Sequence, residues 1–404
     1  MKKILIIEKR KKAKELHNKG WSIRKIAKSL VAGKNNVNKW INMSDEDLIL
    51  DHRGWKKGDL RTHQEVERKR IISIRKQLEK EKSYFTGELV VRKNYECLYG
   101  KTVNQWFVKK VLKDADLVQK RTVKKKGKSK YMKYPKYTLN KLGKILMSID
   151  FIGPKYLKGG KSRINFLSCK YIRPNKLGVM KKIEGQTTDE VIKNLMTLWE
   201  TNPIPDVLKI DNDSAFGSNV LHKNSLGRLT LFLLNLGISP LYIAPRSPWN
   251  NGEVEGFNSV FSKKVWKKLK FEDETELDIE INNFNIEYEK YSYLLENNPE
   301  IKNPRFIEEL NNINFRNNKV GNFRQTKVYY LRIVRREEEK GDKKEKGFIE
   351  ILGNKFFLGK DLINQFTFSV LDIKKEEISI NIETENKGLL EVSKKIIKLK
   401  NIVK

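Results

Sequence analysis

Apolar residues near the start of the chain recur at the spacing of amphipathic helices. Those of 23-IRKIAKSL-30 stand at i, i+3, i+4 and i+7, which is one face of a helix, and the break VAGK follows them. The next segment, 35-NNVNKWI-41, turns its Val, Trp and Ile inward. Two short helices joined by such a break predict a helix-turn-helix within residues 1–45.

In a helix-turn-helix the second helix lies in the major groove of DNA and presents its polar side to the bases. The stretch 22–41 resembles the helix-turn-helix segments of bacterial transposases and resolvases, although Val31 stands where the turn usually has glycine. An ordinary three-helix bundle has the same pattern and remains the alternative. The candidate DNA-contacting residues are Lys34, Asn35, Asn36, Asn38 and Lys39.

A second helical region is expected over residues 60–137. A long charged helix over 64–82 is followed by a recognition-like helix and by the basic stretch 124-KKKGKSK-130. That order predicts a winged-helix-like DNA-binding domain with the lysines as its wing. Because Lys-rich segments are as often solvated linkers, a linker remains the alternative for residues 124–130.

From residue 141 the pattern changes from helical to extended. Three apolar strands separated by short turns are followed by alternating helices and strands, in the order β-β-β-α-β-α-β-α. This order predicts an α/β domain with a mixed five-stranded sheet over residues 141–300, and it is the order of the ribonuclease-H-like fold. A fold by itself does not name a reaction, so the function has to come from the side chains.

Short alternating strands return near the end of the chain. The segments FIEILGNKFFLG, FTFSVLDI and EISINIE are separated by Gly, Asn or Asp, which predicts a small SH3-like β-barrel over residues 320–404. The stretch 349-IEILGNKFFLG-359 resembles the carboxyl-terminal barrel found behind many integrase-type cores. Contact with DNA and contact between subunits are both open as its role.

The net charge is the part of the composition that indicates a kind of partner. The chain of 404 residues has 84 Lys plus Arg against 50 Asp plus Glu, a formal net charge of +34, and the basic residues are spread along its whole length. Such an excess favours a polyanion as partner. No apolar run approaches the roughly 20 residues that span a bilayer, so we expect a cytoplasmic, nucleoid-associated prokaryotic protein with no membrane partner.

Three acidic residues far apart in the chain are candidates for one site. Asp150 lies in the apolar strand 147-MSIDFIG-153, where a carboxylate is costly unless it binds something positive. Asp211 ends the fourth strand, which this topology places beside the first. Glu253 and Glu255 lie on the last helix about 200° apart, so only one can face the sheet. We expect Glu255 to face the two aspartates and Glu253 to serve the helix start, which Asn251 caps.

The residues around these acids resemble the DDE catalytic core of the integrase and transposase superfamily. The matching stretches are S-I-D-F-I-G, K-I-D-N-x-S-A-F and S-P-x-x-N-G-x-V-E-x-F-N. The resemblance implies that Asp150, Asp211 and Glu255 are the catalytic residues and the ligands of two Mg²⁺ or Mn²⁺ ions per active site. Two such ions could activate a water or a 3′-hydroxyl and stabilise the leaving oxygen of a phosphoryl displacement.

Two residues depart from the family pattern. Asp213 replaces the Gly of D-N-G, which leaves open that Asp213 shares or takes the ligand role. Gly256 replaces the Arg of V-E-R and removes a positive partner for phosphate. In the preceding loop, Arg246 and Trp249 are candidates for DNA contact, with an ordinary Pro/Asn turn as the alternative.

The function implied by the resemblance is that of a bacterial insertion-sequence transposase. Such an enzyme cleaves DNA at the element ends and transfers the 3′-hydroxyl ends into target DNA, working as a homo-oligomer on double-stranded DNA. One alternative is a catalytically weak or inactive, transposase-derived DNA-binding regulator. Another is a ribonuclease-H-like nuclease that hydrolyses without strand transfer.

Overall fold

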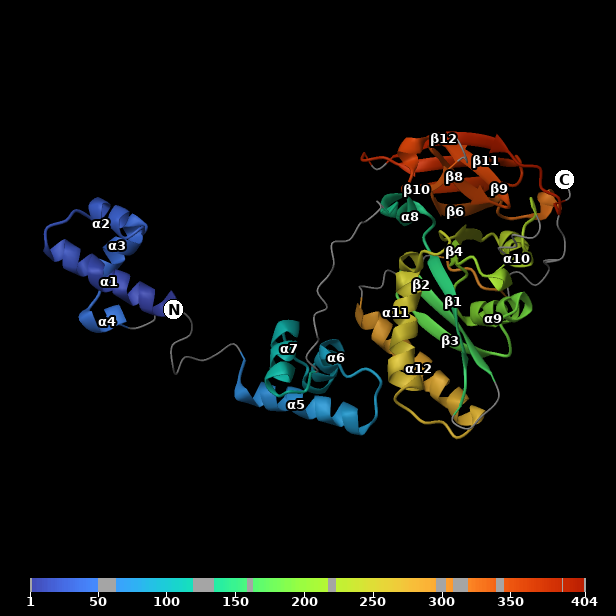
Figure 1. Cartoon of the computed structure of the whole chain (residues 1–404). Coiled ribbons are helices and arrows are strands. Elements are labelled where there is room, and N and C mark those ends of the chain that lie inside the picture. Colours follow the sequence, from blue (N-terminus) through green and yellow to red (C-terminus); the bar gives the residue numbers. More distant parts are fainter. Residues whose placement is uncertain are drawn as a thin grey trace. The chain divides into compact units, whose positions relative to one another are not determined.

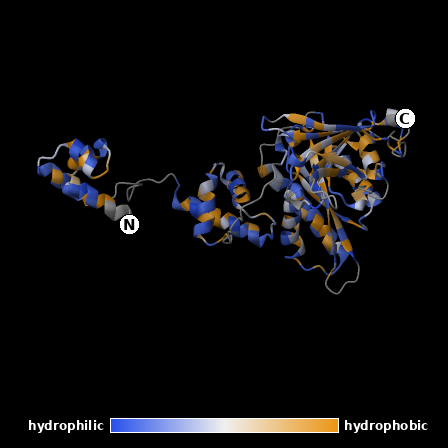
Figure 2. Cartoon of the chain, turned by 45° about the horizontal axis from the view of Figure 1, so that its top comes forward, coloured by the Kyte–Doolittle hydropathy of each residue, from blue (hydrophilic) through white to orange (hydrophobic). Residues whose placement is uncertain are grey.

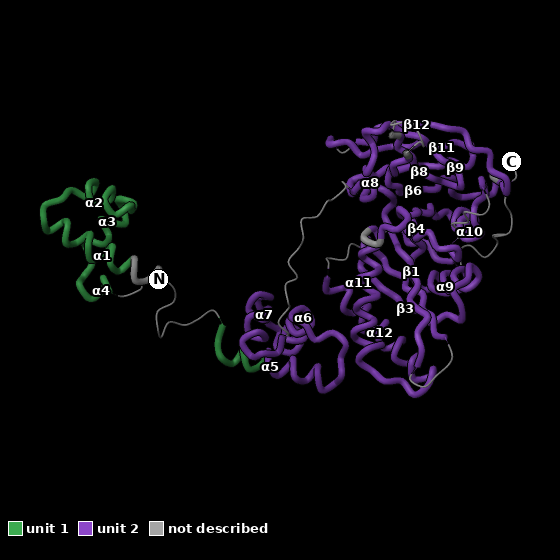
Figure 3. Tube along the Cα trace, in the orientation of Figure 1, with its two compact units in different colours: residues 1–70 green, residues 71–404 purple. Residues whose placement is uncertain are grey.

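The computed structural model describes residues 2–49, 63–118, 134–157, 163–216, 223–295, 303–307, 319–338, 345–386 and 388–402 (Figure 1). Apolar residues lie mainly between the packed elements, and hydrophilic residues cover the outer faces of the helices (Figure 2). The chain divides into two compact units, residues 1–70 and 71–404 (Figure 3). Among the described residues, no helix has both the length and the apolar character needed to cross a membrane.

The first unit is a small helical cluster. Ala13, Ile26 and Val37 are buried at its centre, so the apolar spacing of the sequence predicted its interior correctly. The hydroxyl of Ser22 accepts a hydrogen bond from the Lys25 backbone N–H and caps the second helix. The helices are α1 (Lys2–Asn18), α2 (Ile23–Ser29), α3 (Lys34–Ile41) and α4 (Asp45–Ile49).

The turn between α2 and α3 contains a backbone conformation that suits glycine. Val31 has φ +47° and an 86% exposed side chain, so it gains no packing there that would offset the steric cost. This is the position at which similar helix-turn-helix segments usually have glycine. The structure gives the reason, since the chain turns in the left-handed region at residue 31.

Three further helices form the start of the second unit, with α5 beginning before the boundary. They are α5 (Glu65–Lys80), α6 (Glu88–Tyr99) and α7 (Gln105–Asp114). Ile71, Val91, Tyr95 and Val108 are fully buried between them. The basic stretch 124–130 lies outside the described residues, so the predicted wing stays a prediction.

The centre of the second unit is a mixed sheet with helices on both faces. Strands β1, β2 and β3 are antiparallel neighbours, whereas β4 and β5 run parallel to β1, in the order β3-β2-β1-β4-β5. The five strands expected between residues 141 and 300 are therefore present. Their bounds are β1 (Leu146–Lys155), β2 (Ile164–Arg173), β3 (Gly178–Ile183), β4 (Val207–Ile210) and β5 (Ser239–Tyr242).

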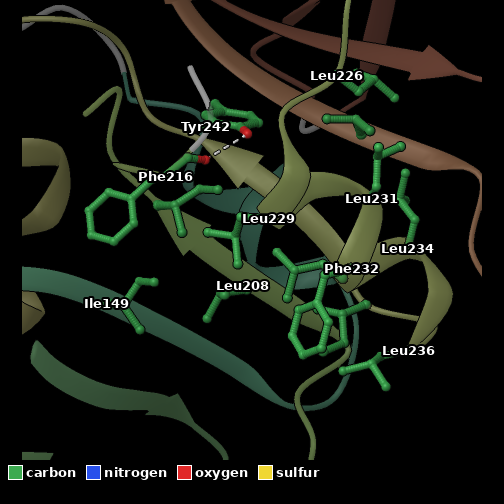
Figure 4. Close-up of a cluster of buried hydrophobic side chains, with 14 of the residues drawn as sticks. Ile149, Leu208, Phe216, Leu226, Leu229, Leu231, Phe232, Leu234, Leu236 and Tyr242 are labelled. Atoms are coloured by element: carbon green, nitrogen blue, oxygen red, sulfur yellow. Dashed lines mark hydrogen bonds between the residues drawn. The ribbon is translucent and has the colours of Figure 1, made fainter. Parts of the chain in front are cut away.

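The two faces of this sheet have different cores. On one face, helices α9 and α10 bury apolar side chains against the sheet. Figure 4 shows Leu229 and Phe232 of α10 in the cluster that also contains Ile149 and Leu208. On the other face, α11 and α12 bury an aromatic cluster that includes Phe257 and Phe284. The helical bounds here are α8 (Lys136–Lys141), α9 (Thr188–Thr201), η1 (Ser214–Phe216), α10 (Arg228–Asn235), η2 (Pro248–Asn251), α11 (Gly252–Phe261), η3 (Ser262–Trp266) and α12 (Glu274–Leu295).

The carboxyl-terminal strands do not stand apart from this sheet. Strand β6 pairs in parallel with β5, and β10, β11 and β12 follow it, giving one nine-stranded sheet. At Val334 the chain passes from β6 into β7, which forms a separate three-stranded sheet with β8 and β9. The bounds are η5 (Val320–Asn322), β6 (Lys327–Ile333), β7 (Arg335–Glu338), β8 (Glu345–Ile351), β9 (Asn354–Leu358), η6 (Lys360–Leu362), β10 (Phe366–Asp372), β11 (Glu377–Glu383) and β12 (Leu389–Ile396).

The strand pairing among the described residues does not show the closed barrel that the sequence pattern predicted over residues 320–404. Alternation of apolar and polar residues predicts a strand but not its partner. The outer edge of β5 offers unpaired backbone groups, and β6 satisfies them through the pairs Leu241 with Tyr329 and Tyr242 with Tyr330. The large mixed sheet is the result.

Candidate active site

Two of the predicted acids lie level with each other on neighbouring strands. Strands β1 and β4 pair in parallel with Leu146 opposite Val207 and Ser148 opposite Lys209, so each residue of β1 meets the residue 61 positions later. Continued by two residues, this register sets Asp150 opposite Asp211, the residue directly after β4. Neighbouring strands are about 4.8 Å apart, and opposed residues share one face of the sheet. The side chains of Asp150 and Asp211 are therefore attached to adjacent backbone positions on that face of the sheet.

Helix α11 is tied to β1 by two asparagines that flank Glu255. The Ser148 hydroxyl donates to Asn251 Oδ1 at 2.7 Å, and Asn258 Nδ2 donates to Asp150 Oδ2 at 2.8 Å. Asn251, Glu255 and Asn258 are spaced i, i+4 and i+7, which is one stripe of a helix. Glu255 therefore lies on the side of α11 that faces Asp150.

A cavity of about 430 Å³ brings these acids together. Its wall includes Asp150, Asp211, Asp213 and Glu255, and we call it the acid cavity. The three side chains that the sequence singled out as ligands thus line one space, together with the acid that the sequence left as an alternative. The remaining wall residues are Asn212, Ile243, Ala244, Pro245, Arg246, Ser247 and Asn251.

The electrostatics of the acid cavity show a shortage of positive charge. Burial is the main cause that raises the pKa of Asp150 to about 7, and the negative charges of Asp211 and Glu255 add to it. Hydrogen bonds from the Phe151 backbone N–H and from Asn258 act in the opposite direction. Burial also raises the pKa of Asp211, with the charge of Asp213 contributing. A cation placed among these oxygens would relieve the repulsion.

The donor set suits a hard divalent cation, although its present arrangement is loose. Carboxylate oxygens are the ligands that Mg²⁺ prefers, and Mg²⁺ usually keeps waters and recruits phosphate oxygens as well. Among the described residues, no group of three or more His, Cys, Asp or Glu side chains stands close enough together to hold a metal ion as it is. The acids share a cavity, but their side chains would have to move to share an ion.

Asp213 has a structural task beside its place in the acid cavity. Its Oδ1 accepts from the Ala215 backbone N–H at 2.8 Å, which holds the start of η1. Its own backbone N–H donates to Asp211 Oδ1 at 2.9 Å and orients that carboxylate. One oxygen of Asp213 is thus engaged locally, and the question whether Asp213 also serves as a ligand stays open.

Glu253 points to a different partner from Glu255. Its Oε2 lies 3.3 Å from Nζ of Lys209, a lysine that is only 4% exposed. The pairing gives the buried ammonium a counter-charge at the start of α11. Asn251 is the N-cap residue of α11, as expected, but its side chain makes no capping hydrogen bond and instead accepts one from Ser148.

The predicted DNA-contacting residues fall in two places. Arg246 is exposed on the wall of the acid cavity with φ +55°. Trp249 lies in η2, and its side chain is outside the described residues. The residues on α3 all have exposed side chains, and they are Lys34, Asn35, Asn36, Asn38 and Lys39.

Sequence reasoning missed the residues that hold the acids in place. Asn251 and Asn258 connect α11 to β1, and Asn212 joins the wall of the acid cavity to Arg332 through its side-chain oxygen. A signal for the first two was available, since both are polar residues beside the packed stripe of Val254, Phe257 and Phe261. No local signal pointed to Arg332, which lies 120 residues beyond Asn212.

No protein-family model matches the chain, and no curated protein matches it. Among solved structures, the chain is similar to one described as a cryoEM structure of the simian T-cell lymphotropic virus intasome in complex with PP2A regulatory subunit B56 gamma. The identity is 12%, the match covers 82% of this chain and 99% of that chain, and the TM-score is 0.31. A likeness this distant says nothing about activity, so the site geometry and the sequence motifs have to support the function.

Proposed function

We propose that the chain is a DDE-type DNA transposase that cleaves DNA at element ends and transfers the 3′-hydroxyl ends into target DNA. The observation that supports it is the meeting of Asp150, Asp211 and Glu255 at one cavity, from β1, the end of β4 and α11. In this proposal the strand order β3-β2-β1-β4-β5 belongs to a ribonuclease-H-like catalytic core over residues 141–300. The polypeptide before it carries DNA-binding domains over 1–45 and 60–137, and strands after it, within 320–404, extend the sheet of the core.

The proposed cofactor is Mg²⁺ or Mn²⁺, held by Asp150, Asp211 and Glu255. When bound, the ions supply the charge that activates the attacking oxygen and stabilises the leaving oxygen. The chain contributes the positioning: Asn258 and the Phe151 N–H hold Asp150, and the Asp213 N–H holds Asp211. Because burial and, second, the charges of Asp211 and Glu255 raise the pKa of Asp150 to about 7, its carboxyl group can exchange a proton for a cation near neutral pH.

Double-stranded DNA is the proposed partner, and the excess of positive charge supports this choice. Lys34 and Lys39, with the asparagines between them, form an exposed polar side on α3 that suits a DNA groove. Arg246 would meet the strand at the acid cavity. Since counterions are released when phosphates are neutralised, DNA affinity should fall steeply as salt rises.

The decisive experiment compares two glutamates on the same helix. Supercoiled plasmid carrying the DNA that flanks the gene is incubated with the full chain and Mn²⁺ or Mg²⁺, and cleavage is scored on gels. We expect Asp150→Asn and Glu255→Gln to abolish cleavage while DNA binding is kept, and Glu253→Gln to leave cleavage within a few-fold of the wild type. Unchanged cleavage by Asp150→Asn or by Glu255→Gln would remove the active-site assignment.

One alternative retains support from the structure. A DNA-binding regulator without catalysis would explain the loose arrangement of the acids and the absence of the family arginine at Gly256. It predicts DNA binding with no metal-dependent cleavage by the wild type. A nuclease that only hydrolyses would cleave but would not join the 3′-hydroxyl product to a second duplex, so a joining assay separates it from the transposase.

A further inference from the structure

A second and larger cavity lies directly beside the acid cavity. Its volume is about 810 Å³, and it is lined by the loop after β5, by residues at the start of α10, and by residues of β6 and β8. The two cavities share the wall residues Asn212, Pro245, Arg246 and Ser247. A molecule that extends through the shared wall region would therefore be in contact with both. We call the larger space the arginine cavity, after its wall residues Arg246, Arg332 and Arg335.

Arg332 is the least ordinary residue of this cavity. It is only 8% exposed, and burial lowers the pKa of its guanidinium to about 10, so it is still charged at neutral pH. Its hydrogen bonds all end on neutral oxygens: the carbonyls of Ile243, Leu331 and Glu350, and the amide oxygen of Asn212. Within the described part of the chain, no carboxylate forms an ion pair with it.

The hydrogen-bond partners of this buried cation are neutral; the charge of Glu350 favours it and that of Arg335 opposes it. A buried cation without an ion pair is costly, and an anion beside it recovers part of that cost. The charge of the surrounding wall points the same way. Of the described residues that line the arginine cavity, three are arginines and one, Glu350, is acidic. Arg246 and Arg335 are exposed, so they can contact a ligand as it enters the cavity. Arg332 is buried and would contact the ligand only once it is inside.

Tyr330 provides a second, independent observation. It lines the arginine cavity, is 3% exposed, and its hydroxyl finds no hydrogen-bond partner among the described residues. Its ring is fixed by stacking on Tyr242 at 5.3 Å between centroids, and the Arg332 guanidinium lies 5.2 Å from its centre. An O–H donor beside a buried guanidinium is a pair of groups that an anionic oxygen would satisfy together.

We propose that the arginine cavity binds a backbone phosphate of the nucleic-acid strand that reaches the acid cavity. Guanidinium groups match the paired oxygens of a phosphate, and the volume is that of an ordinary ligand site and admits a nucleotide unit. Arg332 also donates to Asn212, the neighbour of Asp211, so an anion bound at Arg332 contacts the same loop that carries an acid. The choice of a strand over a free nucleotide rests on the proposed function.

The test measures binding of the dinucleotide d(TpT), which has one phosphodiester, to the full-length chain. Saturation-transfer NMR titration in EDTA and 0.3 M salt keeps metals out and suppresses unspecific attraction to a basic protein. The variants are Arg335→Gln and, at the buried position, Arg332→Met. Methionine removes the guanidinium and fills the space with an apolar, unbranched side chain. The matched control is Arg336→Gln, which removes the same charge one residue further along β7 and does not belong to the cavity wall.

We expect wild type and Asp150→Asn to bind d(TpT) alike, and Arg336→Gln to stay within about twofold of them. Arg335→Gln and Arg332→Met should each weaken binding by about tenfold, the loss expected for one charge-assisted contact. Thermal unfolding of Arg332→Met checks that the variant is folded. If that variant does not fold, Arg335→Gln against Arg336→Gln decides alone.

Three results would overturn the proposal. Equal losses in Arg335→Gln and Arg336→Gln would mean unspecific charge attraction. Binding of thymidine monophosphate without binding of d(TpT) would mean a free-nucleotide site. No binding of either would mean that the cavity takes no phosphate. Because the measurement needs neither metal nor cleavage, its failure leaves the cleavage experiment on Asp150 untouched, and failure of cleavage leaves this result standing.

Discussion

Replacing Asp150 by asparagine should make the folded chain more stable at pH 8, even though Asp150 is the residue most expected to carry activity. Burial and the charges of Asp211 and Glu255 raise the pKa of this carboxyl from its ordinary value of 3.8 to about 7. An unfolded chain ionises Asp150 near pH 4, whereas the folded chain holds the proton up to about pH 7. Folding therefore becomes less favourable as the pH rises through this window, and asparagine removes the effect.

The size of the effect follows from the pKa difference. A shift from 3.8 to about 7 corresponds to at most about 4 kcal/mol at a pH above both values, since one pKa unit is worth about 1.4 kcal/mol. Below pH 4 both states are protonated and the difference vanishes. For a domain of this size, 1 kcal/mol moves the midpoint of thermal unfolding by about 2–4 °C, so a rise on the order of 5–10 °C is expected at pH 8.

The hydrogen bonds of the site should survive the change. The new asparagine can accept from the Phe151 N–H through its oxygen and donate from its amide to Asn258 Oδ1, provided that the Asn258 amide turns over. Asn258 Oδ1 is buried and has no partner among the described residues, so this turn pairs the oxygen and places the amide nitrogen in the unpaired position instead. The substitution thus removes a charge that burial and its neighbours disfavour, and the number of unpaired buried side-chain groups stays the same.

Thermal unfolding of the full chain in EDTA, followed by circular dichroism from pH 4 to pH 8.5, measures the difference. Asp361→Asn, at an exposed position in η6, serves as the control for replacing a carboxylate by an amide outside the acid cavity. The reasoning is refuted if Asp150→Asn is less stable than the wild type at pH 8, or if their difference does not change with pH. Either result would mean that the folded chain does not raise the pKa of Asp150 through burial and neighbouring charge.

Three further outcomes are expected. Mg²⁺ or Mn²⁺ should raise the unfolding midpoint of the wild type at pH 8 and leave that of Asp150→Asn nearly unchanged, since a cation that binds only the folded chain stabilises it; equal shifts would place the ion elsewhere. Val31→Gly should slow hydrogen exchange of the α2 and α3 amides by about fivefold. Val31 is exposed and has a left-handed backbone conformation, which costs valine about 1 kcal/mol more than glycine. Faster exchange in the variant would contradict this cost. Gly256→Arg should stabilise α11 by about 1 kcal/mol, because a Cβ at Gly256 would meet no atom within 4 Å and arginine favours a helix more than glycine does. The added charge should tighten DNA binding, and loss of stability measured by urea unfolding would show that the longer side chain clashes.

The sequence predicted the elements that carry the acids because each has a strong local pattern. Asp150 lies in an apolar run that could only be a buried strand, and Glu255 follows a break that could only start a helix. Even the choice between Glu253 and Glu255 followed from helical geometry, and the structure gives each its own surroundings. What local pattern could not supply was the set of asparagines that lock these elements together, because their partners are about 100 residues away.

The carboxyl-terminal part was harder to predict for a related reason. Its strands alternate clearly, but the edge they join is that of β5, some 85 residues earlier in the chain. That single parallel pairing converts an expected separate barrel into an extension of the central sheet, and it also brings Arg332 next to Asn212. The arginine cavity exists only because of this long-range pairing, so no stretch of sequence shows it.

The two cavities are complementary in what each lacks. The acid cavity holds buried carboxylates that repel one another, and the arginine cavity holds a buried cation that forms no ion pair with any described residue. Asn212 lies in the wall of both, so a ligand carrying a phosphate with associated divalent cations could satisfy both at once. A free metal would relieve only the first cavity, and a free anion only the second. If the two proposals hold together, metal and strand should therefore bind cooperatively, and d(TpT) should bind more tightly with Mg²⁺ than in EDTA in the wild type but not in Asp150→Asn.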